Sequence, residues 1–301
     1  MNATRRAALA ITAAAIGCVL PLAHRSVLAA PDDAFGALRD DFAALEMASD
    51  GRLGVAVLDT RAGVGGFIGY RAEERFPLCS TFKLLAAAAV LKRVDDGKEQ
   101  LDRRVTYAAS DLVTYSPVTK EHVGGDGMTV GELCTAAMTM SDNTAGNLIL
   151  ASLGGPQALT DYARSLGDAV TRLDRIEPDL NEALPDDPRD TTTPAAMLKM
   201  MQAHVLGDAL SQGSREKLIA WLVGNKTGDT RLRAGLPAGW RVGDKTGSGE
   251  HGTSNDVAVA WPPNAAPVLI AVYLTGTIVS AEARNSAIAA IGSAVAARLR
   301  A

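Results

Sequence analysis

The chain has few of the residues that build metal centres and disulfide frameworks. Of its 301 residues, three are cysteine, four are histidine, and aromatic residues make up 4%. Only Cys79 and Cys134 lie beyond the apolar N-terminal stretch, and two cysteines do not make a disulfide framework. The histidines show no H-x-H or H-E-x-x-H spacing, so we expect no metal and no cofactor.

The sequence also lacks an excess of basic residues. It holds 30 Lys and Arg against 34 Asp and Glu, a formal net charge of -4. This balance excludes the basic surface of a nucleic-acid-binding protein. No G-x-S-x-G motif is present, which argues against an α/β-hydrolase. With 47% hydrophobic and 21% charged residues, the composition is typical of a soluble globular protein. We expect a monomer with no nucleic-acid partner and no stable membrane association.

Residues 1–29 have the pattern of an export signal. Arg5 and Arg6 precede an apolar run over residues 7–23, and small residues before Ala29 offer a cleavage site. The sequence therefore predicts a cleaved signal and a periplasmic or secreted protein. The arginine pair resembles a twin-arginine signal, and Cys18 leaves lipidation as a less favoured alternative. Cleavage would remove three arginines and no acidic residue, which takes the net charge from -4 to about -7.

Hydrophobic periodicity gives a helix first, then two strands, a helical block, three strands and a closing helix. The expected ranges are 33–48, 53–59, 67–70, helices from 81 to 223, then 240–245, 256–261, 268–274 and 281–299. We predict an α+β fold, in which N- and C-terminal helices flank an antiparallel sheet and an all-α domain is inserted. The predicted domains are 30–72 plus 224–301 for the sheet and 73–223 for the helices.

Two local signals refine the helical block. Thr129 and Glu132 form a capping-box pattern, and Gly154 is placed to end a helix that begins near Asn143. Residues 177–194 are rich in proline and aspartate and are expected to form a long loop without regular structure. Long loops in compact domains are commonly functional.

Three short motifs could carry chemistry, and each has a plainer structural interpretation. Ser80-Thr81-Phe82-Lys83 places a hydroxyl and an amine on one face of a helix start, but it could be a capping serine beside a surface lysine. Ser141-Asp142-Asn143 could be an N-cap cluster. Lys245-Thr246-Gly247, followed by Ser248, could be an anion site or a strand that enters a glycine turn. Taken singly, each plainer interpretation is favoured.

Glu177 and Asn181 in the long loop complete the set. The four motifs in this order, with the strings 111–119 and 189–194, resemble the class A serine β-lactamases from about Asp33 to the C-terminus. The resemblance implies hydrolysis of a small-molecule β-lactam, such as a penicillin or cephalosporin, and antibiotic resistance.

Roles in covalent catalysis follow from this resemblance. It implies that Ser80 is the acylated nucleophile, with Lys83 as its neighbour and possible base. Ser141 would relay a proton to the β-lactam nitrogen. Glu177 and Asn181 would hold the deacylating water, and either Lys83 or Glu177 could be the acylation base.

The resemblance also implies a binding arm for the substrate. Lys245, Thr246 and Ser248 would hold the substrate carboxylate, and Arg231 would reach it from a neighbouring strand. Backbone N–H groups of Ser80 and Ser248 would form the oxyanion hole. Two further residues are implied at the site: Asn143, on the acylamino side chain of the substrate and on Lys83, and Tyr115, at the pocket mouth.

Several positions depart from the family pattern. Ile176 stands where tryptophan is usual. Ala87 stands where many members have the disulfide partner of Cys134, and Gly249 stands where carbapenem-hydrolysing members bond the cysteine that precedes the nucleophile. We therefore expect two free thiols. Arg175 and Asp190 bracket the long loop and are predicted to pair.

Two alternatives share the serine and lysine motifs. One is a D-alanyl-D-alanine peptidase or transpeptidase, and the other is a non-hydrolytic β-lactam sensor. Both usually lack the loop glutamate, so Glu177 together with Asn181 argues against them.

Overall fold

The computed structural model describes residues 31–61 and 66–299. The predicted signal over residues 1–29 lies outside the described residues. Within the described part of the chain, no helix is both long and apolar enough to cross a membrane.

Five antiparallel strands form the sheet, and they come from both ends of the chain. In spatial order they are β2 (Phe67–Tyr70), β1 (Arg52–Asp59), β9 (Val268–Thr275), β8 (Ser254–Trp261) and β7 (Arg241–Ser248). β1 and β9 lie side by side at the centre, with Val55 opposite Val272. The first strand therefore pairs with the last, as the predicted α+β fold requires.

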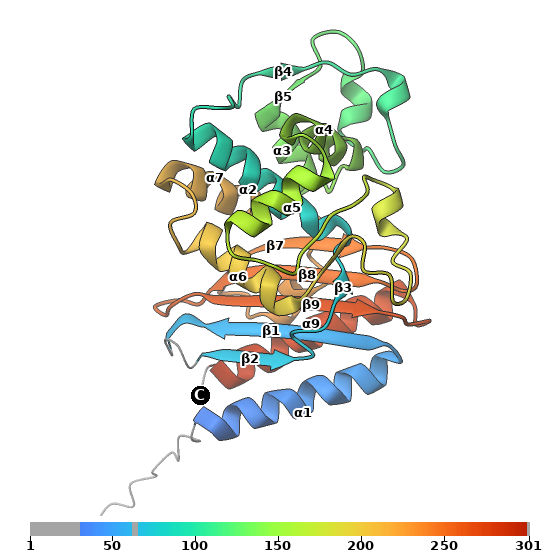
Figure 1. Cartoon of the computed structure of the whole chain (residues 1–301). Coiled ribbons are helices and arrows are strands. Elements are labelled where there is room, and N and C mark those ends of the chain that lie inside the picture. Colours follow the sequence, from blue (N-terminus) through green and yellow to red (C-terminus); the bar gives the residue numbers. More distant parts are fainter. Residues whose placement is uncertain (1–30, 62–65, 300–301) are drawn as a thin grey trace, which may run out of the picture.

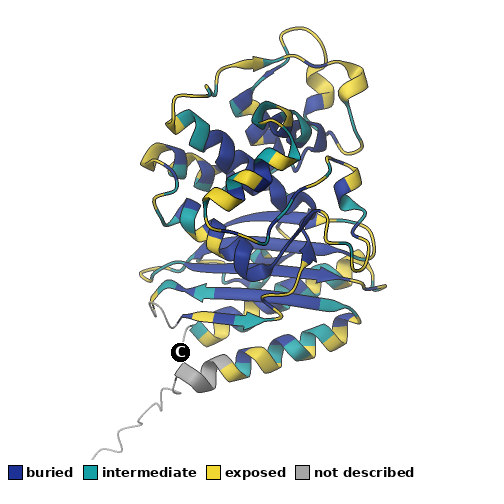
Figure 2. Ribbon diagram, in the orientation of Figure 1, coloured by how far each residue is buried: buried dark blue, intermediate teal, exposed yellow. Residues whose placement is uncertain are grey.

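Helices cover both faces of this sheet (Figure 1). One face packs against α1 (Pro31–Ser49), α8 (Leu232–Gly235) and α9 (Ala281–Leu299), and the other against α6 (Pro194–Val205) and the helical block. Val55 and Val57 of β1 belong to the hydrophobic core under α1, α8 and α9. Ala56 belongs to the core under α6 and the helical block. Because both faces of the sheet are covered, β9 is buried along its whole length (Figure 2) and is almost continuously apolar rather than alternating.

The helical block surrounds α2 (Phe82–Asp95), in which every residue from Phe82 to Leu91 is buried. Its four alanines at 86–89 let neighbouring helices approach closely. The surrounding helices are α3 (Val130–Thr139), α4 (Asn143–Leu153), α5 (Pro156–Ser165) and α7 (Gln212–Val223). The predicted capping box is present, because the Thr129 hydroxyl accepts from Glu132 N and the Glu132 carboxylate accepts from Thr129 N. Gly154 ends α4 at a φ of 107°.

Several short elements were not predicted. β3 (Phe76–Pro77) pairs with β6 (Thr191–Thr192), β4 (Arg104–Val105) pairs with β5 (Met128–Thr129), and four single turns are 3-10 helices: η2 (Cys79–Thr81), η3 (Ala109–Asp111), η4 (Thr119–His122) and η5 (Asp179–Asn181). The expectation that 177–194 has no regular structure was therefore wrong at η5 and β6. Two- and three-residue elements are too short to show a hydrophobic period.

Candidate active site

The turn that precedes α2 presents Ser80 at the junction of the sheet and the helical block. Cys79 has a φ of 43°, a left-handed conformation that is uncommon for a residue with a side chain and is often found at functional sites. The Ser80 hydroxyl lies 2.9 Å from Lys83 Nζ and 3.1 Å from Glu177 Oε1. A nucleophile and two candidate bases are therefore within hydrogen-bond reach of one another.

Lys83 is fully buried and its ammonium is surrounded by acceptors. It donates to Ser80 Oγ, to the Ser141 carbonyl at 2.8 Å and to Asn143 Oδ1 at 2.6 Å. It also forms an ion pair of 2.9 Å with Glu177. Burial lowers the pKa of Lys83 from its ordinary value, and the Glu177 carboxylate opposes that shift.

The segment 141–143 both caps a helix and places two polar side chains at the candidate site. Asp142 is the N-cap of α4, and it also accepts from both backbone and hydroxyl of Thr119. With Asp142 fixed in this way, Ser141 adopts a φ of 56° and its hydroxyl accepts from Lys245 Nζ at 3.0 Å. Asn143 lies on the other side of the cap and accepts from Lys83.

Lys245 lies on β7 and is fully buried. Besides Ser141, its ammonium donates to the carbonyl of Thr246 at 2.8 Å. Burial, followed by repulsion from Lys83, lowers the pKa of Lys245 from 10.5 to about 7. The Lys245 ammonium therefore loses its proton, and with it its charge, as the pH rises through about 7.

The end of β7 passes directly beside the Ser80 turn. A Cβ atom added at Gly247 would lie 3.1 Å from the Leu78 carbonyl and 3.3 Å from Cys79 Cβ, so this close approach favours glycine. Ser248 follows at the strand end. The end of β7 that carries Ser248 and the turn that carries Ser80 are therefore neighbours, which the predicted oxyanion hole would require.

Arg231 lies beside Ser248, but its place differs from the expected one. It is the N-cap residue of α8 rather than part of a strand. Its guanidinium donates to the carbonyls of Gly247 and Asn255, at 2.7 and 2.6 Å, and to Ser248 Oγ at 2.7 Å. Its Nε donates to Asn285. Arg231 is thus held against β7, and its contact with the site is the Ser248 hydroxyl.

The Glu177 side chain is buried and fixed from three directions. Oε1 contacts Ser80 and Lys83, and Oε2 accepts from the Asn181 amide. Asn147 of α4 clamps the backbone of Glu177, with its Oδ1 accepting from Glu177 N and its Nδ2 donating to Glu177 O, both at 2.8 Å. The peptide bond from Glu177 to Pro178 is cis. Asn147 was not predicted from the sequence, because no local pattern links two residues 30 positions apart.

Arg175 and Asp190 close the loop as predicted. They form an ion pair of 2.6 Å, and Asp190 also accepts from the backbone N–H groups of Asp174 and Arg175. Arg175 forms a second pair with Glu182 at 2.5 Å. The Asp190 carbonyl accepts from Leu78 N at 2.8 Å, which ties the loop to the turn that carries Ser80.

The remaining predicted positions lie around this centre. Tyr115 is 55% exposed at the rim, and its carbonyl accepts from Asn143 N at 3.0 Å. Thr246 Oγ1 lies 2.5 Å from the hydroxyl of Thr227, a residue that the sequence analysis did not single out. Cys79 and Cys134 are buried free thiols. Among the described residues, no group of three or more His, Cys, Asp or Glu side chains could hold a metal ion.

Comparison with known proteins gives a consistent answer. The model of the "Beta-lactamase enzyme family" matches residues 37–299. Beta-lactamase CTX-M-97 from Escherichia coli is 52% identical over 252 residues, which are 84% of this chain and 86% of the relative.

Two solved structures are also similar. The ancestral (GNCA) class A β-lactamase is 66% identical, with a TM-score of 0.84 over 86% of this chain and 98% of the other. The putative class A β-lactamase PenP from Rhodopseudomonas palustris is 62% identical, with a TM-score of 0.85 over 87% and 99%. The chain therefore belongs to the β-lactamase enzyme family, as a class A serine β-lactamase.

Proposed function

We propose that this chain hydrolyses the β-lactam amide through an ester on Ser80, which a water activated by Glu177 then removes. The observation that carries the proposal is the shared geometry of three side chains. Ser80 Oγ, Lys83 Nζ and Glu177 Oε1 lie within 3.1 Å of one another. Neither a peptidase nor a sensor needs a carboxylate at this distance from its nucleophile, so the two alternatives are not favoured.

Acylation begins when Ser80 attacks the lactam carbonyl and loses its proton. An ammonium has three N–H donors and no acceptor, and Lys83 directs its donors at Ser80, Ser141 and Asn143. The Glu177 carboxylate is the acceptor beside the same hydroxyl. We therefore assign the Ser80 proton to Glu177, with Lys83 stabilising the charge. Backbone N–H groups of Ser80 and Ser248 would stabilise the oxyanion, by roughly 3–4 kcal/mol for each donor.

Ring opening requires a proton on the β-lactam nitrogen as the C–N bond breaks. The Ser141 hydroxyl is the donor in this assignment. Lys245 donates to its oxygen and can return the proton that Ser141 gives up. The proton that Glu177 took from Ser80 then passes to solvent and Lys245 regains one from solvent, so that Glu177 is again a carboxylate before deacylation. The substrate carboxylate would lie against Lys245, Thr246 and Ser248, with Asn143 on the acylamino group and Tyr115 covering the mouth.

Deacylation adds one water to the ester and restores the Ser80 hydroxyl. Glu177 would take a proton from that water, and the Asn181 amide, which donates to the same carboxylate, would orient it. The product is the ring-opened β-amino acid.

Multiple-turnover hydrolysis of nitrocefin tests the proposal. We expect the wild-type protein to convert many equivalents and Ser80→Ala to show no acyl adduct and no turnover above background. Asp126→Asn, in an exposed loop, serves as a matched control. A burst of one equivalent followed by arrest in the wild-type protein would instead identify a sensor or a penicillin-sensitive peptidase.

We also infer that the protein is exported by its N-terminal segment and acts as a monomer without nucleic-acid or membrane partners. The support is the sequence of residues 1–29 and the acidic balance of the remainder. N-terminal sequencing of protein from the periplasm should begin at Ala30, and light scattering should give the mass of one chain. A lipidated cysteine at the N-terminus would contradict the cleavage site.

A further inference from the structure

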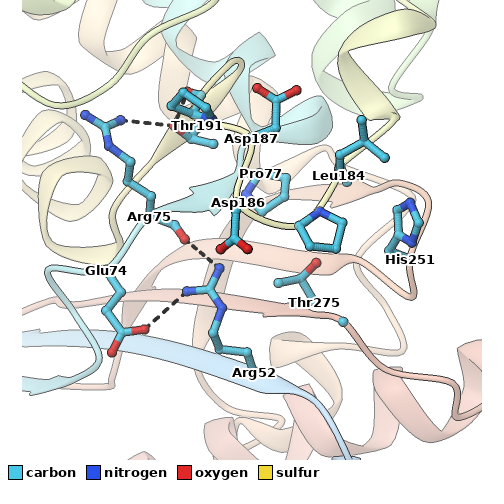
Figure 3. A pocket seen from close by; sticks show the side chains of 14 residues that line it. Arg52, Glu74, Arg75, Pro77, Leu184, Asp186, Asp187, Thr191, His251 and Thr275 are labelled. Atoms are coloured by element: carbon cyan, nitrogen blue, oxygen red, sulfur yellow. Dashed lines mark hydrogen bonds and ion pairs between the residues drawn. The ribbon is translucent and has the colours of Figure 1, made fainter.

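A cavity of about 540 Å³ lies between the second half of the Glu177 loop and the sheet (Figure 3). Residues 183–188 form one wall, and Arg52 of β1, Pro77 of β3 and Thr275 of β9 form the other. None of the residues proposed for catalysis lines it. Its volume is in the range of small-molecule sites, roughly 300–1,000 Å³.

The loop wall carries a carboxylate, that of Asp186, which has no partner among the described residues. Asp186 is exposed, and within residues 31–61 and 66–299 its side chain has no hydrogen bond and no ion pair. In Figure 3 its carboxylate points into the cavity, toward the guanidinium of Arg52. Among the described residues the two groups do not form an ion pair with each other, and Arg52 pairs instead with Glu74 at 3.2 Å.

Arg52 is held in place on the opposite wall. Its Nη1 donates to Glu74 at 3.2 Å, its Nη2 donates to the Arg75 carbonyl at 2.7 Å, and its guanidinium lies 4.0 Å above the Phe76 ring. A guanidinium has five N–H groups, and these two bonds occupy only two of them. Arg52 is therefore a preorganised cation with donor capacity left for a ligand.

The rest of the lining is mixed. Glu74, Arg75 and Asp187 are charged but have partners within the protein. Pro77, Leu184 and Pro185 give the cavity an apolar part, and the ring of His251 stands at the far end (Figure 3). Leu184 is 38% exposed although it is a large aliphatic residue. Because the other charged side chains of the lining are paired, Arg52, Asp186 and the apolar part are the groups left for a ligand.

We propose that this cavity is a second binding site, separate from the reaction centre, for a small zwitterion of the α-amino-acid class with an apolar side chain. Adjacent carboxylate and ammonium groups on one carbon match the opposed cation and anion. The ligand carboxylate binds Arg52, its ammonium binds Asp186, and its side chain packs on Leu184 and Pro185. Binding here does not depend on β-lactam hydrolysis.

A ligand in this place couples to the catalytic loop. It joins residues 183–188 to β1, and that stretch lies between Asn181, which contacts Glu177, and Asp190, which closes the loop. A molecule that binds the closed loop stabilises it by mass action. Amide hydrogen exchange within residues 177–190 therefore slows when the cavity is filled.

Titration of the ¹⁵N-labelled protein with L-phenylalanine tests the site directly. We expect saturable shifts at residues 183–188, 251 and 275–276, with half-saturation in the roughly millimolar range. The methyl ester, which lacks the carboxylate, and N-acetylphenylalanine, which lacks the ammonium, should each bind more weakly. Asp186→Asn and Arg52→Gln should each weaken binding by roughly fivefold or more.

Two matched variants control for indirect effects. Arg241→Gln removes another arginine that stacks on an aromatic ring, Trp261 at 4.8 Å, and Asp126→Asn removes another exposed loop carboxylate. Both should bind as the wild-type protein does. Asparagine tolerates the φ of 61° at position 186, so that variant keeps its fold. No shifts at these residues, or unchanged binding in Asp186→Asn, would overturn the proposal, as would equal binding of the methyl ester.

Discussion

Glu177 and Lys245 reach the reaction centre from opposite sides and are held there by different kinds of partner. On the loop side, Glu177 contacts Ser80, Lys83 and Asn181 through side chains, so several protons lie on one short network. On the strand side, Lys245 and Arg231 divide their donors between carbonyl oxygens of the sheet and side chains. The loop side is a network of side chains that exchange protons, whereas the strand side holds its cations against the sheet and exchanges a proton only through the Lys245–Ser141 contact.

This difference predicts which step a substitution on each side should affect. Side-chain partners of Glu177 depend on a loop that ion pairs close, so loosening the loop should affect the chemical steps. The cations of the strand side depend on a sheet that is paired along its whole length, so changes there should affect substrate binding with the loop intact. The following variants separate the two sides, in order of decreasing effect.

Asp190→Asn should produce the largest loss of stability. It removes the charge that pairs with Arg175 and leaves a mostly buried cation with only Glu182 as a partner. Breaking a buried pair costs roughly 3–5 kcal/mol, and the partial exposure of Arg175 places the expected loss at the lower end of that range. We expect the Tm to fall by several degrees and deacylation to slow more than acylation, measured by calorimetry and stopped-flow kinetics. Asp96→Asn breaks an exposed pair with Lys92 and is the control. Wild-type melting and kinetics in Asp190→Asn would make the pair incidental.

Arg231→Ala should lower kcat/KM for benzylpenicillin by about ten- to a hundredfold, which is the range for a lost charge-assisted hydrogen bond. Because Arg231 contacts the site through the Ser248 hydroxyl, the double variant with Ser248→Ala should lose less than the sum of the two single losses. The methyl ester of benzylpenicillin, which has no carboxylate, should be affected little. Additive losses would show that Arg231 and Ser248 act separately.

The strand side should also give kcat/KM a pH limit. With a pKa of about 7, the Lys245 ammonium is present below that pH and is lost as the pH rises through it. For carboxylate-bearing substrates we expect kcat/KM to fall by up to about tenfold per pH unit above this value. Lys245→Arg keeps its charge at all these pH values and should move the fall upward. If kcat/KM of Lys245→Arg falls at the same pH as that of the wild-type protein, the fall is caused by another titrating group.

The smallest expected effect on kcat is at Gly249, which lies between β7 and the loop that carries Asn181. A Cβ atom at Gly249 would lie 2.7 Å from Cys79 Sγ and 2.7 Å from the Asn181 carbonyl. Gly249→Cys should therefore bond Cys79 and shift Asn181 slightly, with a modest loss of kcat that reducing agent reverses. Thiol titration of the denatured, unreduced protein should find one thiol in the variant and two in the wild-type protein. Three thiols in the variant would contradict the proximity.

The sequence predicted this fold well where the signal was local. The capping box at Thr129 and the stop at Gly154 are each encoded within a few residues. The β3–β6 pair was out of reach, since two residues such as Phe76–Pro77 show no period and their partners lie more than 100 positions away.

The same limit applies to the candidate site. Ser80, Lys83 and Lys245 could be singled out as candidates because their motifs are short. Asn147 and Thr227 were missed because their contacts, to the Glu177 backbone and the Thr246 hydroxyl, join distant segments. The place of Arg231 was wrong because a strand was assumed where the chain forms α8.

Intact-mass spectrometry of Glu177→Gln with benzylpenicillin tests the central claim most directly. The variant keeps the size of the side chain and removes the base, so product release should slow by roughly 10²- to 10⁴-fold. Acylation should slow less, because Lys83 Nζ remains 2.9 Å from Ser80 Oγ and can take its proton when deprotonated. If Glu177 is the deacylation base, a persistent adduct of one penicillin on Ser80 should accumulate while the wild-type protein shows none. Turnover of Glu177→Gln at the wild-type rate, with no adduct, would contradict the account.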